Sequence, residues 1–115
     1  MPKTLKEIFK VKDEEELRDI DPSVLLDGVI KHIRELDRKE FTKALQYLPF
    51  QAQFLAMKER CNKAKDEIAC SSLRVAIEGD PSAPAGSPKN LGLRGLWEQE
   101  RNEFAKDVLK MLGEL

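Results

Sequence analysis

The 115-residue sequence is poor in aromatic residues, has a single histidine and two cysteines, and contains no long apolar run. Aromatic residues make up 6% of the chain, whereas alanine, leucine, glutamate and lysine are plentiful, so the composition favours helices over strands. No apolar stretch approaches the roughly 20 residues that a membrane-spanning helix needs. We therefore expect an all-α protein that does not enter a membrane.

An excess of one charge is also missing. Charged residues make up 36% of the chain, yet the net charge is −1 because the two signs are interleaved. Such a surface produces no strong field to attract nucleic acid or an acidic membrane. Two modest basic patches nevertheless keep a small dimeric nucleic-acid-associated regulator as an alternative function. They consist of Lys58, Arg60, Lys63 and Lys65, and of Arg34, Arg38, Lys39 and Lys43.

No set of residues forms a recognisable catalytic or metal-binding motif. His32 has no cysteine near it in sequence, and no phosphate-binding loop or nucleophile elbow is present. The acidic run from Asp13 to Glu16 is typical of the first turn of a helix rather than of paired catalytic carboxylates. We expect a protein that is not an enzyme and has no cofactor or metal. A small-molecule-binding helical protein or an enzyme stays a second alternative.

The two cysteines predict a reducing location. Cys61 and Cys70 fall nine residues apart in a predicted helix. Nine helical steps turn the chain by about 900° and separate the residues by roughly 13 Å along the axis. A disulfide needs Cα atoms within about 7 Å, so we expect two reduced thiols, with Cys61 in the core, and a cytoplasmic protein. Met1 to Lys10 also lacks the continuous apolar region of a signal peptide.

Helix start signals divide the first half of the chain. Thr4 and Asp13 are suitable N-caps for two short helices that would form an N-terminal arm. Asp21 followed by Pro22 is the clearest start signal, because aspartate caps well and proline fits the first helical position. The helix that follows is expected over 23–36.

Two positions in this region allow more than one interpretation. Gly28 lies inside the predicted helix, where it either permits close approach of another element or is simply tolerated. Asp37 can begin a new helix, with Glu40 at the capping-box position. A single continuous helix over 23–48 is the alternative, because Asp37 is not a strong helix breaker.

The longest predicted helix runs from Phe50 to Glu78. Apolar residues recur along it at steps of four and three, the spacing that keeps side chains on one stripe of a helix. These seam residues are Phe50, Phe54, Met57, Cys61, Ala64 and Ile68. A helix of this length would span roughly 42 Å, and its stripe must be covered by another element.

Four glycines and three prolines are concentrated between Gly79 and Gly95, which predicts an exposed, partly mobile loop. A final helix is expected over 96–112. Four large apolar residues at the end of the loop could dock on a partner, and their alternative role is to pack the last helix onto the protein's own core. These candidate partner-binding residues are Leu91, Leu93, Leu96 and Trp97.

Together these features predict one helical domain over residues 1–115. We expect an antiparallel bundle of three to four main helices, with a short N-terminal helical arm and one long central helix. The helices before Pro49 are too short to cover the whole central seam, which favours a homodimer. The predicted function is a non-enzymatic protein–protein interaction or assembly module whose partner is a protein, possibly a second copy of the chain.

Overall fold

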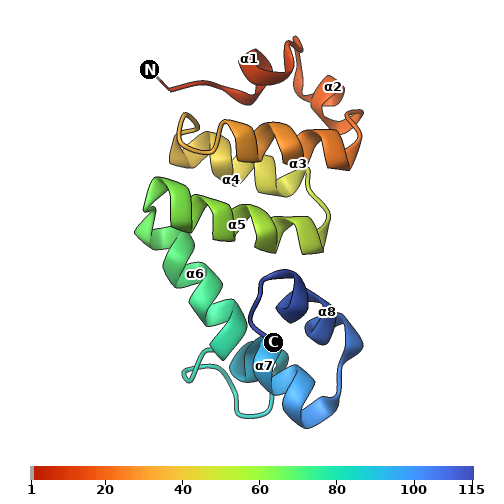
Figure 1. The fold of residues 1–115 in the computed structure, drawn as a ribbon, viewed down its shortest axis with the longest axis vertical. Coiled ribbons are helices and arrows are strands. Elements are labelled where there is room, and N and C mark those ends of the chain that lie inside the picture. Colours follow the sequence, from red (N-terminus) through yellow and green to blue (C-terminus); the bar gives the residue numbers. More distant parts are fainter. Residues whose placement is uncertain (1) are drawn as a thin grey trace.

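A computed structural model describes residues 2–115 and shows an all-helical chain (Figure 1). Within these residues an isolated parallel bridge between Lys3 and Leu36 is the only β-type pairing. Met1, the first residue of the segment predicted to lack signal-peptide character, lies outside the described part. The helices are α1 Leu5–Phe9, α2 Glu14–Arg18, α3 Pro22–Lys31, α4 Arg38–Gln46, α5 Phe50–Ala64, α6 Glu67–Glu78, α7 Pro88–Glu100 and α8 Glu103–Met111.

The predicted start signals in the first half are confirmed. The Thr4 side chain accepts a hydrogen bond from the backbone N–H of Glu7, and Asp13 caps α2 in the same way. Asp21 caps α3, with Pro22 in its first turn. Asp37 caps α4 by accepting from the Glu40 N–H at 2.8 Å, so the chain breaks there and the continuous helix over 23–48 is wrong.

Helix α3 ends earlier than predicted, at Lys31, and a turn leads to Asp37. Inside α3, Gly28 permits a close approach. A Cβ atom at this position would lie 2.5 Å from the ring of Phe9, the last residue of α1, because α1 packs on α3. The Phe9 ring therefore occupies the space that any larger residue would need.

The predicted long helix over Phe50 to Glu78 is wrong, because the chain bends sharply at Lys65 and Asp66. Lys65 adopts a left-handed conformation with φ of 55°, which ends α5. Asp66 then caps α6 by accepting from the N–H groups of Ile68 and Ala69 at 3.0 and 3.2 Å. We call Lys65 and Asp66 the elbow.

The elbow also overturns the prediction of two reduced cysteines. Cys61 and Cys70 form a disulfide, and their Cα atoms lie 4.8 Å apart. The roughly 13 Å separation expected from an unbroken helix does not apply, since the two residues belong to different helices. The argument for a cytoplasmic location rested on free thiols and loses that basis.

The glycine- and proline-rich segment is more ordered than expected. Helix α7 begins at Pro88, with Ser87 as its N-cap, so the connecting loop covers only 79–87. The backbones of Gly79 and Gly92 are in direct contact. A Cβ at Gly92 would lie only 2.4 Å from the Gly79 nitrogen, so there is no space for a side chain there. The predicted final helix over 96–112 is also split, since Arg101 is left-handed and Asn102 caps α8.

The buried apolar residues form two clusters that share α5. Helices α1 to α4 stack on one side of α5, and α6 leads away to α7 and α8 at the other end (Figure 1). The N-terminal cluster comprises Leu5, Leu17, Leu25, Val29, Ile33, Leu36, Phe41, Ala44, Leu48 and Ala56. The C-terminal cluster comprises Phe54, Ile77, Leu93, Ala105, Val108, Leu109 and Leu112. Met57 of α5 packs against both clusters and links them.

Candidate functional site

An apolar groove is lined by residues of α5, α6, α7 and α8, on the side of α5 away from α1. Its cavity volume is about 360 Å³. We define the apolar groove by its lining residues, which are Phe50, Phe54, Val75, Ala76, Pro88, Lys89, Gly92, Leu93, Leu96, Asn102 and Phe104.

The floor and the rim of the groove differ in burial. Phe54 and Leu93 form the floor and belong to the C-terminal cluster. Phe50, Val75 and Phe104 form the rim and are 66%, 44% and 44% exposed. These exposed fractions are high for side chains of this size, so the rim presents apolar surface to solvent.

The three aromatic residues of the groove pack against one another. The Phe50 and Phe54 ring centroids lie 5.7 Å apart, and the Phe104 ring meets the Phe50 ring edge-on at 6.2 Å. Aromatic pairs at these separations favour tilted and edge-to-face arrangements. Phe50 and Phe104 therefore support one another and present a preformed apolar surface to solvent.

The structure brings together only part of the predicted partner-binding set. Leu93 and Leu96 line the groove, although Leu93 is itself buried. Trp97 packs against the C-terminal cluster, and the charged groups of Arg101 and Lys106 lie over its ring at 5.1 and 4.8 Å. Leu91 is half-buried and lies outside the groove.

The sequence prediction missed the exposed rim residues Phe50, Val75 and Phe104. Phe50 belongs to the seam of the predicted long helix, which we expected to be covered, and Phe104 lies in the predicted final helix. The broken helices leave both residues exposed, and Ile68 at the other end of the central seam is likewise 57% exposed. A stripe that continues beyond its covering helix is the signal that could have identified them.

Polar groups are few in the groove. The Asn102 side chain is occupied, because its oxygen accepts from the Ala105 N–H at 2.9 Å as the cap of α8. Lys89 adds a positive charge, and Glu103 adds a negative charge beside Phe104. Two hydrogen bonds from Ser82 and, more weakly, the charge of Lys89 lower the pKa of the nearby Asp80 carboxyl.

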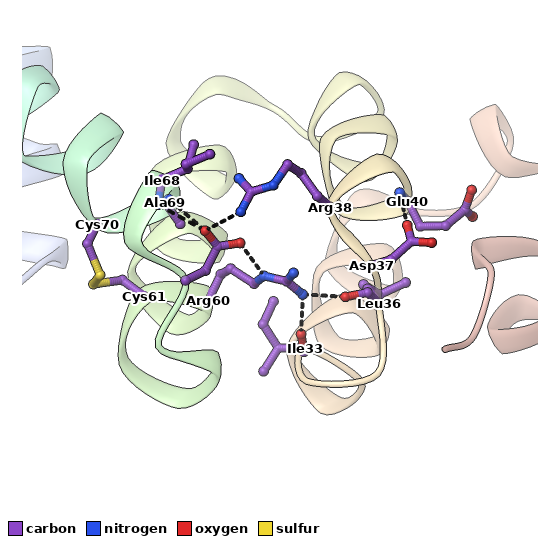
Figure 2. A network of polar contacts seen from close by, with 11 residues as sticks. Ile33, Leu36, Asp37, Arg38, Glu40, Arg60, Cys61, Ile68, Ala69 and Cys70 are labelled. Carbon is purple, nitrogen blue, oxygen red and sulfur yellow. Dashed lines mark hydrogen bonds and ion pairs between the residues drawn. A yellow bond between two sulfur atoms is a disulfide. The ribbon is translucent and has the colours of Figure 1, made fainter. Parts of the chain in front are cut away.

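A polar network at the elbow fixes the direction of α6 (Figure 2). Arg60 is buried, and its Nε donates to an Asp66 carboxylate oxygen at 2.9 Å. Its Nη1 donates to the backbone oxygens of Ile33 and Leu36, which join α5 to the turn after α3. Arg38 donates to the other oxygen of Asp66 at 3.1 Å. The network thus ties α4, α5 and α6 together.

Asp66 is ionised within this network. Burial alone would raise its pKa, but hydrogen bonds from Arg60 and the Ala69 N–H, with the charges of Arg38 and Arg60, outweigh burial and lower the pKa. The buried Arg60 guanidinium therefore stabilises the charged form of the Asp66 carboxylate. The pair is a structural support for the elbow rather than a binding site, because all of its partners are internal.

The other titratable candidates lie apart from the groove. His32 ends α3, and its Nδ1 lies 3.3 Å from a Glu35 oxygen. Asp13 caps α2, and Glu14 pairs with Lys43 at 3.4 Å. Across residues 2–115, no group of three or more histidine, cysteine, aspartate or glutamate side chains is placed to hold a metal ion.

Several basic residues of the two sequence patches are engaged internally. Lys58 donates to the Leu112 carbonyl oxygen at 2.6 Å, and Lys63 pairs with Glu59 at 2.9 Å. Arg34 donates to the Lys63 carbonyl oxygen at 2.9 Å. The Glu59 carboxylate offsets the charge of Lys63, and the two carbonyl contacts hold Lys58 and Arg34 against the chain, so these residues are less available to a phosphate backbone.

No family model matches this chain, and no curated protein or solved structure is significantly similar to it. Within residues 2–115, no helix is both long enough and apolar enough to cross a membrane.

Proposed function

We propose that this protein is a non-enzymatic helical interaction and assembly module that binds an apolar helix surface in its groove. The observation that carries the proposal is the exposed, prearranged pair Phe50 and Phe104 at the rim of a groove with an apolar floor. Exposed aromatic anchors beside a well-packed pocket are typical of protein–protein interfaces. A polar metabolite would need converging polar groups, and the groove offers only Lys89 beside the occupied Asn102.

The partner we propose is a second copy of the chain. A two-fold interface requires that the same patch be complementary to itself. The groove meets this requirement in two ways, because Phe104 is an exposed apolar side chain that can enter the partner's groove, and the adjacent Glu103 carries a charge opposite to that of Lys89. The net charge of −1 adds little repulsion between copies.

Two further predictions concern the fold and the location of the protein. An antiparallel bundle of three to four main helices is supported by α3, α4 and α5, whose axes run alongside one another in Figure 1. A cytoplasmic location stays a prediction, although the disulfide removes its original argument.

The proposal is tested by measuring molar mass in solution with light scattering and sedimentation, under oxidising conditions. We expect a concentration-dependent dimer for the wild type and a monomer for Phe104→Glu, since a carboxylate cannot enter the apolar groove. Val24→Glu is the matched control, because Val24 is 54% exposed on α3, away from the groove, and its substitution should leave the dimer intact.

A wild type that stays monomeric at high concentration contradicts the second copy as partner. If that monomer binds an amphipathic helical peptide and Phe104→Glu does not, the partner that occupies the groove is a different protein. A Phe104→Glu variant as dimeric as the wild type would remove the groove from the interface.

A further inference from the structure

The disulfide closes the elbow on a different side from the ion pairs. In Figure 2 the Cys61–Cys70 bridge lies on one side of the α5–α6 junction, and Arg60 lies on the other. Arg60 pairs there with Asp66. At the junction, Lys65 holds a φ of 55°, a region that residues other than glycine rarely adopt. The bend is thus held from two sides against a local conformational cost.

The elbow controls the relative placement of two groove walls. One wall is on α5, which contributes Phe50 and Phe54, and the facing wall on α6 contributes Val75 and Ala76. Phe50 lies eleven residues before Cys61, about 16 Å along the helix axis, and Val75 lies five residues after Cys70, about 8 Å along its helix. A change in the angle at the elbow therefore changes the distance between the rim residues.

The fold does not depend on the disulfide alone. Neither cysteine takes part in the hydrogen bonds that Asp66 accepts from Arg60 and from the Ile68 and Ala69 N–H groups, nor in the packing of Ile77 in the C-terminal cluster. Loss of the bridge should therefore loosen the elbow rather than unfold the chain. A disulfide whose loss loosens the elbow without unfolding the chain can regulate the groove, whereas a disulfide that is essential for folding cannot.

The chemistry requires an external reductant, for which a dithiol is sufficient. Cys61 and Cys70 are both half-buried, so a small thiolate can approach them. Its sulfur attacks one cysteine sulfur, the S–S bond breaks, and a mixed disulfide forms. The second thiol of the reductant then displaces this cysteine. The protein gains two electrons and two protons as two thiols, and the dithiol is oxidised to its disulfide.

We propose that the Cys61–Cys70 disulfide is a redox-sensitive clamp on the groove, so that reduction weakens self-association while the fold persists. The clamp regulates the site described above, and its effect on self-association rests on the proposed function. Its effect on the elbow is independent of any partner. The two effects are therefore measured separately.

The test compares the wild type with and without dithiothreitol, using hydrogen exchange for the elbow and sedimentation for the dimer. We expect faster amide exchange across α6 with α3 and α4 unchanged, and a dimer dissociation constant raised by about tenfold. The double variant Cys61→Ala with Cys70→Ala is the matched control. It should behave like the reduced wild type in both measurements and should not respond to dithiothreitol.

Three results would overturn the clamp. The first is exchange in α6 that does not change on reduction, and the second is global unfolding of both the reduced wild type and the double variant. The third is a dimer of unchanged affinity despite faster exchange in α6. If the oxidised protein forms no dimer, the self-association proposal fails, and the exchange measurement alone decides whether the disulfide clamps the elbow.

Discussion

The N-terminal and C-terminal regions of this protein are both helical but differ in how much apolar surface they expose. In α1 to α4 most apolar residues pack against one another, and Leu5, Leu17 and Leu25 are almost completely buried. Around α6 to α8, a buried centre at Val108 and Leu109 is bordered by exposed apolar side chains. The difference fits the proposed function, in which the N-terminal region would be the support and the C-terminal region the binding surface.

The lengths of the helices differ between the two regions. Helices α1 to α4 have 5 to 10 residues, which allows each apolar stripe to fold back towards α5. Side-chain caps and left-handed helix ends occur in both regions, but Lys65 and Arg101 end longer helices of 15 and 13 residues. The interrupted stripes then diverge, and the residues at their ends stay exposed at the groove.

The largest expected effect comes from cutting the link between the two regions. Arg60→Ala leaves the buried Asp66 carboxylate without its main partner, and loss of one member of a buried pair costs about 3–5 kcal/mol. Urea denaturation at neutral pH measures the free energy of unfolding. Arg38→Ala is the control, because Arg38 contacts the same carboxylate but its side chain is 52% exposed, so about 1 kcal/mol or less is expected. Equal losses in the two variants would contradict the central role of Arg60.

A matched pair of core substitutions tests whether the regions unfold together. Leu25→Ala in the N-terminal cluster and Leu109→Ala in the C-terminal cluster each remove a buried leucine and should cost about 2–5 kcal/mol. Because α5 and Met57 belong to both regions, we expect a single transition in each variant when urea unfolding is followed by circular dichroism and by Trp97 fluorescence. Two separate transitions, with only one shifted by each substitution, would show that the regions fold independently.

The smallest of the three effects is a pH dependence that originates at the elbow. The pKa of Asp66 is lower in the folded chain than in the unfolded chain. Its contribution to stability is therefore complete above the unfolded value of about 4 and is lost as the pH falls through the lower folded value. Comparing wild type with Asp66→Asn by urea denaturation should show a difference at pH 7 that shrinks towards pH 3. A difference that grows on acidification would mean that the sign of this linkage is wrong.

The sequence predicted the helical class and the N-terminal caps because those signals are local. Thr4, Asp13, Asp21 and Asp37 each act on the N–H groups that follow within three residues, and no distant contact is needed to interpret them. The central helix was predicted to continue through Lys65 because no glycine or proline near that residue signals a break. Asp66 falls inside that predicted helix, although its side chain caps α6.

The missed elbow accounts for most of the later errors. The disulfide and the exposed ends of the apolar seam depend on the bend, and the bend depends on Arg60, which reaches the backbone of Ile33 and Leu36 across 24 or more residues of sequence. Contacts of that range leave no periodic signal in the chain. The groove was found only in part, through Leu93 and Leu96, because its rim residues follow patterns that are normally buried.

The contact between the backbones of Gly79 and Gly92 separates the loop over 79–87 from the rest of the protein, so this loop is a suitable site for attaching a label. The Asp80 N–H donates to the Lys89 carbonyl oxygen at 2.9 Å, which closes the base of the loop above the glycines. At the tip, a Cβ added to Gly86 would meet no atom within 4 Å. A peptide tag or a fluorescent reporter inserted beside Gly86 should therefore be carried without disturbing either cluster, and would give this protein a permissive position for labelling in cells.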